Sequence, residues 1–260
     1  MSLRCWMPPL LAIQFMTRIP VPGLAALHSD DVAAGMVRSA GWYPLAGGLV
    51  GAISAGVLVL SEGLWPRSVA VLITLIAEAW LTGAFHEDAV ADFCDGFGGG
   101  QTPERIHAIM KDSRIGAYGS VGLILAVGLR AALLCAVPAG LVAPALIGSA
   151  AFGRWHAVVP QALLSSPPGI RGMASDIVSG TGARELAIAT CVLVPFLLPL
   201  LWLRPEAMLL ACALSAAFMG WFFRFVMRHL GGVTGDCLGF AVYAGQMIVL
   251  LCMVAAWPPA

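Results

Sequence analysis

The residues best suited to chemistry lie between positions 86 and 115, in the stretch HEDAVADFCDGFGGGQTPERIHAIMKDSRI. Asp88, Asp92 and Asp95 are spaced at i, i+4 and i+7, so on a helix their carboxylates follow one stripe. Like charges at this spacing repel each other, and a bound cation would remove the repulsion. Because hard divalent cations such as Mg²⁺ take oxygen ligands, the stripe predicts a metal site with two or three of the aspartates as ligands. A solvated helix face and a cation-transport site are the alternatives.

His86 comes directly before this stripe. A histidine beside carboxylates could act as a general base, or could hydrogen-bond to a metal-bound carboxylate. An imidazole that is simply paired with a neighbour explains the position equally well.

Two further polar segments could bind phosphate. Thr102, Pro103 and Glu104 predict a helix start, and that helix would carry Lys111, Asp112 and Arg114 at its far end. Lysine and arginine are the usual phosphate partners, although basic residues also flank membrane spans. The segment GGVTGDCLGF lets the backbone approach a ligand closely and contains Thr234 and Asp236, although Asp236 could be a plain helix cap.

Together, the acidic stripe, the basic residues and the glycine-rich segment predict phosphoryl transfer from a nucleoside diphosphate, assisted by a metal ion. Arg154, in the segment GRWHAVVPQ, is a further candidate to meet a phosphate. Arg130 and Arg224, which also fall within or near apolar runs, are expected to snorkel or to form structural ion pairs.

The elements that position these residues are predicted to be membrane helices. Of the 260 residues, 60% are hydrophobic and 11% are charged, which indicates an all-α, polytopic integral membrane bundle in contact with the lipid bilayer. The formal net charge is zero, and the sequence has no basic stripe of the kind that binds nucleic acid, so no nucleic-acid partner is expected. We expect a single membrane domain over residues 1–260, with the catalytic segment at about 86–115 and a short interfacial or re-entrant helix at the N-terminus. Seven apolar runs are long enough to span: 42–60, 68–85, 116–136, 141–165, 185–203, 207–227 and 237–257.

The distribution of basic residues predicts the orientation. If the N-terminus faces the cytoplasm, only Arg67 and Arg204 fall on the opposite side, which satisfies the positive-inside rule. The acidic stripe, the loop 166–184 and the GGVTGD segment then share the cytoplasmic face. The cytoplasmic side would hold Arg4, Arg18, Arg38, Arg105, Lys111, Arg114, Arg171, Arg184 and Arg228.

At these motifs the chain resembles the adenosylcobinamide-GDP ribazoletransferases, also called cobalamin phosphate synthases. The resemblance runs nearly end to end and is carried by AIQFMTRIPVP, GWYPLAGGLVGAI, FHEDAVADFCDGFGGG with IMKDSRIGAYG, and GGVTGDCLGF. It implies an enzyme of the bacterial cytoplasmic membrane, requiring Mg²⁺, in which a ribose hydroxyl of α-ribazole or its 5′-phosphate attacks adenosylcobinamide-GDP and expels GMP. The product is adenosylcobalamin or its 5′-phosphate, which completes the lower nucleotide loop of cobalamin.

The resemblance also implies roles for individual residues. Asp88, Asp92 and Asp95 would be catalytic and would hold the metal, and His86 matches the signature histidine. The residues expected to bind substrate are Lys111, Asp112 and Arg114 on the diphosphate, Thr234 and Asp236 in the closing motif, and Arg18 in the opening motif. In two places the chain departs from the pattern: Ala89 replaces the usual glycine, and Glu87, which would either add a metal ligand or face water, replaces an apolar residue.

Two other functions fit parts of the sequence. A CDP-alcohol phosphotransferase also uses Mg²⁺ to displace a nucleoside monophosphate, but its motif has an alanine-arginine pair soon after Asp-Gly, and here Asp95-Gly96 is followed by Phe97. A cation-coupled transporter would use Glu78, Arg154 and His156 as a path across the membrane, but the polar segments cluster on one side. The sequence leaves open whether the chain forms a homo-oligomer.

Overall fold

The computed structural model describes residues 6–23, 29–170 and 172–255, so Arg4 and Arg171 lie outside the described residues. Every regular element in the described residues is helical, which confirms the all-α class. The α-helices are α1 (Met7–Met16), α2 (Ser29–Ser39), α3 (Tyr43–Glu62), α4 (Arg67–Thr82), α5 (Phe85–Gly99), α6 (Pro103–Met110), α7 (Ala117–Ala136), α8 (Val142–Leu163), α9 (Met173–Gly180), α10 (Ala183–Leu203), α11 (Pro205–Leu230) and α12 (Gly235–Val254). Two 3₁₀ turns, η2 (Ala40–Trp42) and η3 (Ala139–Leu141), precede α3 and α8.

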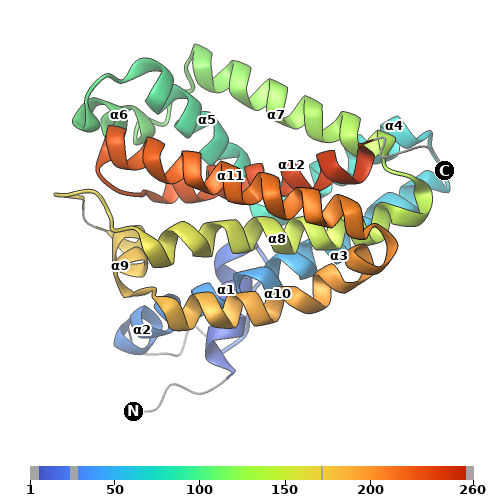
Figure 1. Ribbon diagram of the computed structural model, residues 1–260, viewed down its shortest axis with the longest axis horizontal. Coiled ribbons are helices and arrows are strands. Elements are labelled where there is room, and N and C mark those ends of the chain that lie inside the picture. The colour runs from blue at the N-terminus through green and yellow to red at the C-terminus, as the bar shows by residue number, and fades with distance from the viewer. Residues whose placement is uncertain (1–5, 24–28, 171, 256–260) are drawn as a thin grey trace.

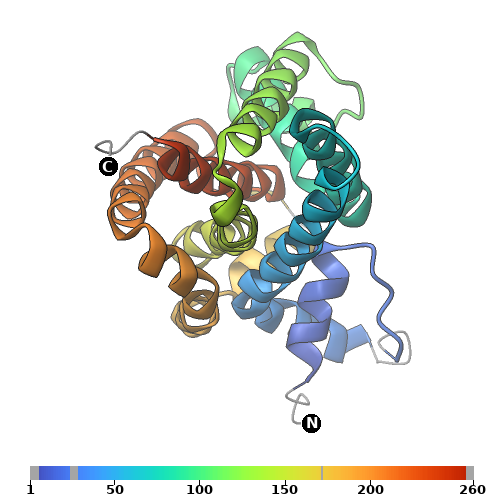
Figure 2. The same cartoon turned by 90° about the vertical axis from the view of Figure 1, so that its right-hand side faces the viewer.

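Helix α8 lies in the middle of the bundle and contacts α3, α10 and α12 (Figures 1 and 2). Small residues allow this close packing, as is usual where membrane helices cross. A Cβ atom added at Gly51 of α3 would lie 2.5 Å from the Leu146 carbonyl oxygen of α8. A Cβ atom added at Gly153 of α8 would lie 2.6 Å from the Val242 carbonyl oxygen of α12.

The membrane spans differ in part from those expected. Within the described residues, five helical segments are long and apolar enough to cross a bilayer, and the bent pair α4–α5 makes six. These segments, which identify a multi-pass membrane protein, are Val32–Glu62, α7, α10, α11 and α12. The remaining predicted span, 141–165, forms the single helix α8 but is not one of the candidates. This helix is largely enclosed by other helices and includes buried polar residues such as Ser149, Arg154 and Gln161.

A sharp elbow separates α4 from α5. The two helices meet at an angle of 89°. Gly83 ends α4 with φ of 73°, and Ala84 follows with φ of 55°, so two successive residues are left-handed. Glycine adopts this conformation readily, whereas alanine pays a steric cost there. Next to the elbow, the Arg18 backbone N–H donates to the carbonyl oxygen of Leu81, near the end of α4, at 2.7 Å.

The polar segments gather at one end of the bundle, on the left in Figure 1. The short helices α6 and α9 lie at this end, together with the start of α12. The contact between Lys111, just after α6, and Asp236, in the first turn of α12, joins two of the predicted segments across 125 positions of sequence. Convergence of these two segments, predicted from the alternation of spans, is confirmed.

Candidate active site

An open polar cleft of about 510 Å³ lies between α5, the segment after α6 and the start of α12. Asp88 is exposed and Asp92 is half-buried, because they lie on the face of α5 that looks away from the bundle core. We call this space the polar cleft; its charged lining residues are Glu87, Asp88, Asp92, Lys111, Asp112, Arg114 and Asp236.

Lys111 and Asp236 form the ion pair that bridges the cleft. The Lys111 Nζ atom lies 3.1 Å from Asp236 Oδ2. The lysine side chain remains 58% exposed, so it has room to contact a ligand as well. Thr234 lies beside this pair as the N-cap of α12, and its hydroxyl accepts from the Cys237 N–H at 3.4 Å.

Asp95 has a different environment from the other two aspartates. It is buried, and its carboxylate accepts from the N–H of Gly116 at 2.6 Å and from the N–H of Gly119 at 2.8 Å. Both N–H groups belong to the start of α7, where backbone donors lack intrahelical partners and the helix dipole favours a negative charge. Asp95 therefore anchors α7 to α5.

The described residues contain no group of three or more histidine, cysteine, aspartate or glutamate side chains arranged to hold a metal ion. The predicted clamp of three aspartates is therefore not assembled in this structure, and the physical reason is the engagement of Asp95 with α7. Asp88 and Asp92, with Asp236 opposite, still offer the carboxylate oxygens that Mg²⁺ prefers. Such sites often use only one or two protein carboxylates, with water and substrate phosphates completing the shell. Magnesium binding at Asp88 and Asp92 stays a prediction.

Asp112 and Arg114 form a local pair in the loop between α6 and α7. Arg114 donates to Asp112 from its backbone N–H at 3.1 Å and from its guanidinium at 2.6 Å. These hydrogen bonds lower the pKa of Asp112 from 3.8 to about 2. The Arg114 side chain is 87% exposed at the rim of the polar cleft, so a phosphate can reach it from solvent.

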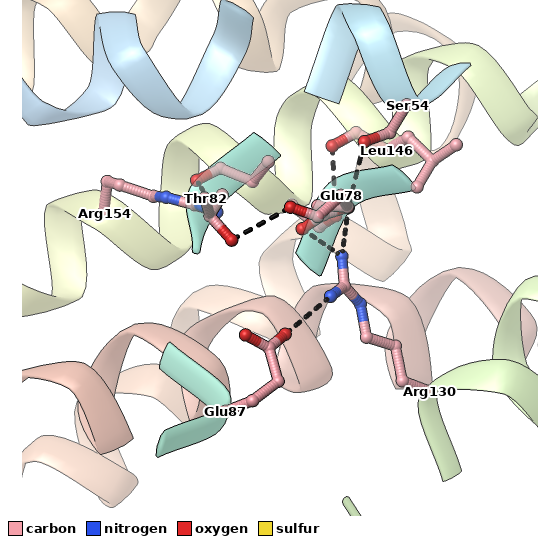
Figure 3. A network of polar contacts seen from close by, with 9 residues as sticks. Ser54, Glu78, Thr82, Glu87, Arg130, Leu146 and Arg154 are labelled. Carbon is pink, nitrogen blue, oxygen red and sulfur yellow. Dashed lines mark hydrogen bonds and ion pairs between the residues drawn. The ribbon is translucent and has the colours of Figure 1, made fainter. Parts of the chain in front are cut away.

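A buried charge network that includes Glu87, a residue of the polar cleft, connects neighbouring helices (Figure 3). Arg130 of α7 donates to both carboxylate oxygens of Glu78 of α4, at 2.7 and 2.8 Å, and its Nη1 lies 3.8 Å from Glu87 of α5. Ser54 of α3 also donates to Glu78, at 3.0 Å. The network ties four helices together at the elbow. Glu87 also lines the polar cleft, and its role as a metal ligand stays a prediction.

Three other predicted site residues have separate environments in the bundle: His86, Arg154 and Arg18. His86 is 3% exposed and its Nε2 has no hydrogen-bond partner in the described part of the chain. Arg154 is 1% exposed within α8, and its Nε likewise has no partner among the described residues. It lies inside the bundle beside the charge network, not at the mouth of the cleft (Figure 3). The Arg18 guanidinium packs against the elbow, where a Cβ atom on Gly83 would lie 2.8 Å from its Nε.

Two of the three residues proposed for a transporter path, Glu78 and His156, are occupied in structural contacts. Glu78 forms an ion pair with Arg130, which confirms the structural ion pair expected as one of two possibilities for Arg130. His156 has its Nε2 atom 2.7 Å from the Ser215 Oγ atom and its Nδ1 atom 3.0 Å from the Phe152 carbonyl oxygen.

Comparison with known proteins identifies the family of this chain. The family model described as cobalamin-5-phosphate synthase matches residues 8–254. The chain belongs to the cobalamin-5-phosphate synthase family. Among its curated relatives, each called adenosylcobinamide-GDP ribazoletransferase, the protein of Leptothrix cholodnii is 37% identical over 95% of this chain and 93% of its own length. The protein of Ralstonia nicotianae is 38% identical over 94% of this chain and 93% of its own length. The protein of Vibrio cholerae (strain O395) is 34% identical over 95% of this chain and 92% of its own length. No solved structure matches the chain.

In this member of the cobalamin-5-phosphate synthase family, the two departures from the expected motif have a structural explanation. The Ala89 side chain packs against α12 at Gly239, a position where an added Cβ would collide with that of Ala89. Glu87 takes part in the charge network with Arg130. Both substitutions therefore affect how α5 packs on its neighbours, and both leave the aspartates of the polar cleft in place.

Sequence reasoning missed several residues that contribute to the site. Tyr43, Phe85 and Gln161 line a second cavity beside the polar cleft. They lie on three different helices within apolar runs, so no local pattern distinguishes them from core residues. The buried pair of Glu78 and Arg130, by contrast, can be suspected from the sequence, because a charged residue in an apolar run requires a partner.

Proposed function

We propose that this chain catalyses transfer of the adenosylcobinamide phosphate group of adenosylcobinamide-GDP to α-ribazole or its 5′-phosphate, with release of GMP. Family membership over residues 8–254 supports the reaction. The observation that carries the assignment to a site is the polar cleft, in which the acidic motif, the basic motif and the closing motif meet. We place this cleft at the cytoplasmic face of the inner membrane of a bacterium.

The residues of the cleft divide into two chemical roles. Lys111 and Arg114 would bind the diphosphate, the lysine as a point charge and the arginine as a planar fork. They would also neutralise the charge that develops on the departing GMP. Asp112 would keep Arg114 oriented toward the cleft, because the Asp112 carboxylate accepts hydrogen bonds from both the backbone N–H and the side chain of Arg114.

Asp236 is the carboxylate best placed to receive a proton, because it lines both the polar cleft and the neighbouring cavity and is not assigned to the metal. In the proposed step, a ribose hydroxyl of the acceptor gives its proton to Asp236 as the hydroxyl oxygen bonds to the phosphorus that carries the adenosylcobinamide group. The bond from that phosphorus to the oxygen of GMP breaks, and GMP leaves with the electron pair. Mg²⁺ held by Asp88 and Asp92 would neutralise the phosphate oxygens and so lower the barrier to attack.

The proposal is tested by incubating the full-length protein in detergent with adenosylcobinamide-GDP, α-ribazole and Mg²⁺. We expect one GMP for each adenosylcobalamin formed, and no GMP when α-ribazole is left out. In a parallel reaction, CDP-diacylglycerol replaces adenosylcobinamide-GDP. Release of CMP in that reaction, without GMP release in the first, would instead assign the chain to CDP-alcohol phosphotransfer.

A further inference from the structure

A second cavity, of about 280 Å³, adjoins the polar cleft, and we call it the apolar cavity. Asp88, Lys111 and Asp236 line both spaces, so they form the wall that the two share. Beyond that wall the lining is mostly apolar and aromatic. The Phe15 ring lies 5.9 Å from Tyr43 in a stacked arrangement and 5.6 Å from Phe85 edge-on, both between ring centroids.

Two polar side chains that line the apolar cavity each have an atom that no described residue satisfies. His86, which is 3% exposed, leaves Nε2 without a partner, and Gln161, which is 2% exposed, leaves Oε1 without one. Gln161 Nε2, by contrast, donates to the Thr181 hydroxyl at 3.1 Å. A buried polar atom without a partner destabilises the folded protein, so both atoms favour a ligand that can pair with them.

We propose that the apolar cavity binds the two-ring aromatic base of the acceptor, α-ribazole. This inference rests on the proposed function and assigns the acceptor to a particular part of the site. The His86 imidazole donates to the free ring nitrogen of the base, and the Gln161 Oε1 atom accepts from a ribose hydroxyl. The aromatic side chains surround the dimethylbenzimidazole rings, which favours stacked or edge-on contacts.

The chemistry of the lining distinguishes this base from the other large groups in the reaction. Guanine carries several donors and acceptors on its edges, and most of them would remain unpaired in a cavity with so few polar atoms. Dimethylbenzimidazole needs only one hydrogen bond, at its free ring nitrogen, and its two methyl groups suit apolar walls. A corrin ring is far larger than a cavity at the lower edge of the usual range of about 300–1,000 Å³ for small ligands.

The shared wall also fits the direction of the reaction. In phosphoryl transfer, the attacking and leaving oxygens lie roughly in line on opposite sides of the phosphorus. A base in the apolar cavity directs its ribose to the wall formed by Asp88, Lys111 and Asp236. GMP then leaves on the opposite side, into the polar cleft beside Arg114.

The test uses an exposed residue at the cavity, so that a substitution leaves the fold intact. Ala174 of α9 lines the apolar cavity, and Ala174→Leu would extend a side chain into it. Ser179→Leu, also exposed on α9 but not among the cavity residues, is the matched control. Binding of α-ribazole to the full-length protein in detergent is measured by calorimetry without donor, with 5,6-dimethylbenzimidazole and guanosine as competitors.

We expect Ala174→Leu to weaken α-ribazole binding roughly 10-fold, the scale of one misfitted group in an apolar pocket, and Ser179→Leu to leave it unchanged. Dimethylbenzimidazole should compete with α-ribazole and guanosine should not. Equal α-ribazole affinity in Ala174→Leu and the control, or competition by guanosine alone, would overturn the assignment of the cavity. Absence of GMP release by the wild-type protein, with the expected binding pattern intact, would refute the proposed reaction and leave the cavity assignment standing.

Discussion

Asp92 and Asp95 are three residues apart on α5, yet their carboxylates have different partners. Asp92 faces the polar cleft with Asp88, Lys111 and Asp236, whereas Asp95 accepts two backbone hydrogen bonds from the start of α7. Spacing on a helix shows which side chains share a stripe. It does not show that a neighbouring helix start will engage one of them.

The separate roles predict separate effects of the same substitution. Asp95→Asn should lower the free energy of unfolding by about 1–3 kcal/mol, because an amide cannot accept from both N–H groups as the carboxylate does. The thermal midpoint of the purified protein in detergent measures the change. Asp92→Asn is the control and should leave the midpoint near that of the wild type. A lowered midpoint in Asp92→Asn with none in Asp95→Asn would contradict the assignment of Asp95 to anchoring α7.

Lys111 should act on the donor substrate. Lys111→Ala removes a positive charge from the polar cleft, and we expect the KM for adenosylcobinamide-GDP to rise about 10–100-fold, the scale of a lost hydrogen bond to a charged group. Arg184→Ala removes an exposed charge at the start of α10, outside the residues that line the cleft, and should leave this KM unchanged. An equal rise in both variants would show a general loss of charge attraction, not a contact with the diphosphate.

At the scale of the elements, α8 and α3 pack closely because glycine allows their backbones to approach. The Gly51→Ala variant would place a Cβ atom 2.5 Å from the Leu146 carbonyl oxygen, so we expect a loss of about 1–3 kcal/mol in stability. Gly56 lies on the same helix with nothing within 4 Å of an added Cβ. Gly56→Ala should therefore stabilise α3 slightly, through helix propensity. Thermal unfolding in detergent compares the two variants, and equal midpoints would refute the close crossing of α3 and α8.

The sequence predicted much at this scale, and the misses have physical causes. Hydrophobic runs located the long helices, and Thr102 caps α6 as expected, since its hydroxyl accepts from the Arg105 N–H at 3.3 Å. The elbow between α4 and α5 was not predicted, because it depends on left-handed backbone at Gly83 and Ala84 and on contacts from elsewhere in the chain. For the same reason Gln161 could not be found: its role depends on which helices surround it.

At the scale of the whole molecule, the long helices alternate in direction, and α6 and α9 lie at one end (Figure 1). The polar cleft is lined by residues of α5, the segment after α6 and the start of α12, so it belongs to this end. The connection from α3 to α4 and the connection from α10 to α11 lie at the other end. Arg67 is the first residue of α4, and Arg204 lies between α10 and α11. Basic residues are therefore concentrated at the end that carries the cleft. Together with the positive-inside rule, this arrangement supports a cytoplasmic site.

Reporter fusions test the orientation. If the positive-inside rule gives the orientation, residue 112 faces the cytoplasm and residues 139 and 204 face the periplasm. Green fluorescent protein joined after residue 112 should then fluoresce, and alkaline phosphatase joined after residue 139 or 204 should be active. The reverse pattern would place the polar cleft outside the cell, away from a cytoplasmic supply of nucleotide substrates.

The central claim is that Asp88 and Asp92 hold a metal ion where the diphosphate of adenosylcobinamide-GDP binds. Its most direct measurement is GMP release by wild-type protein and by Asp92→Asn, with Mg²⁺ titrated into metal-free buffer at saturating adenosylcobinamide-GDP and α-ribazole. We predict no release by the wild type without Mg²⁺, saturable activation on its addition, and at least a 100-fold loss in Asp92→Asn, which corresponds to about 2.7 kcal/mol of transition-state stabilisation. Wild-type release that is independent of Mg²⁺, or unchanged activation in Asp92→Asn, would contradict the claim.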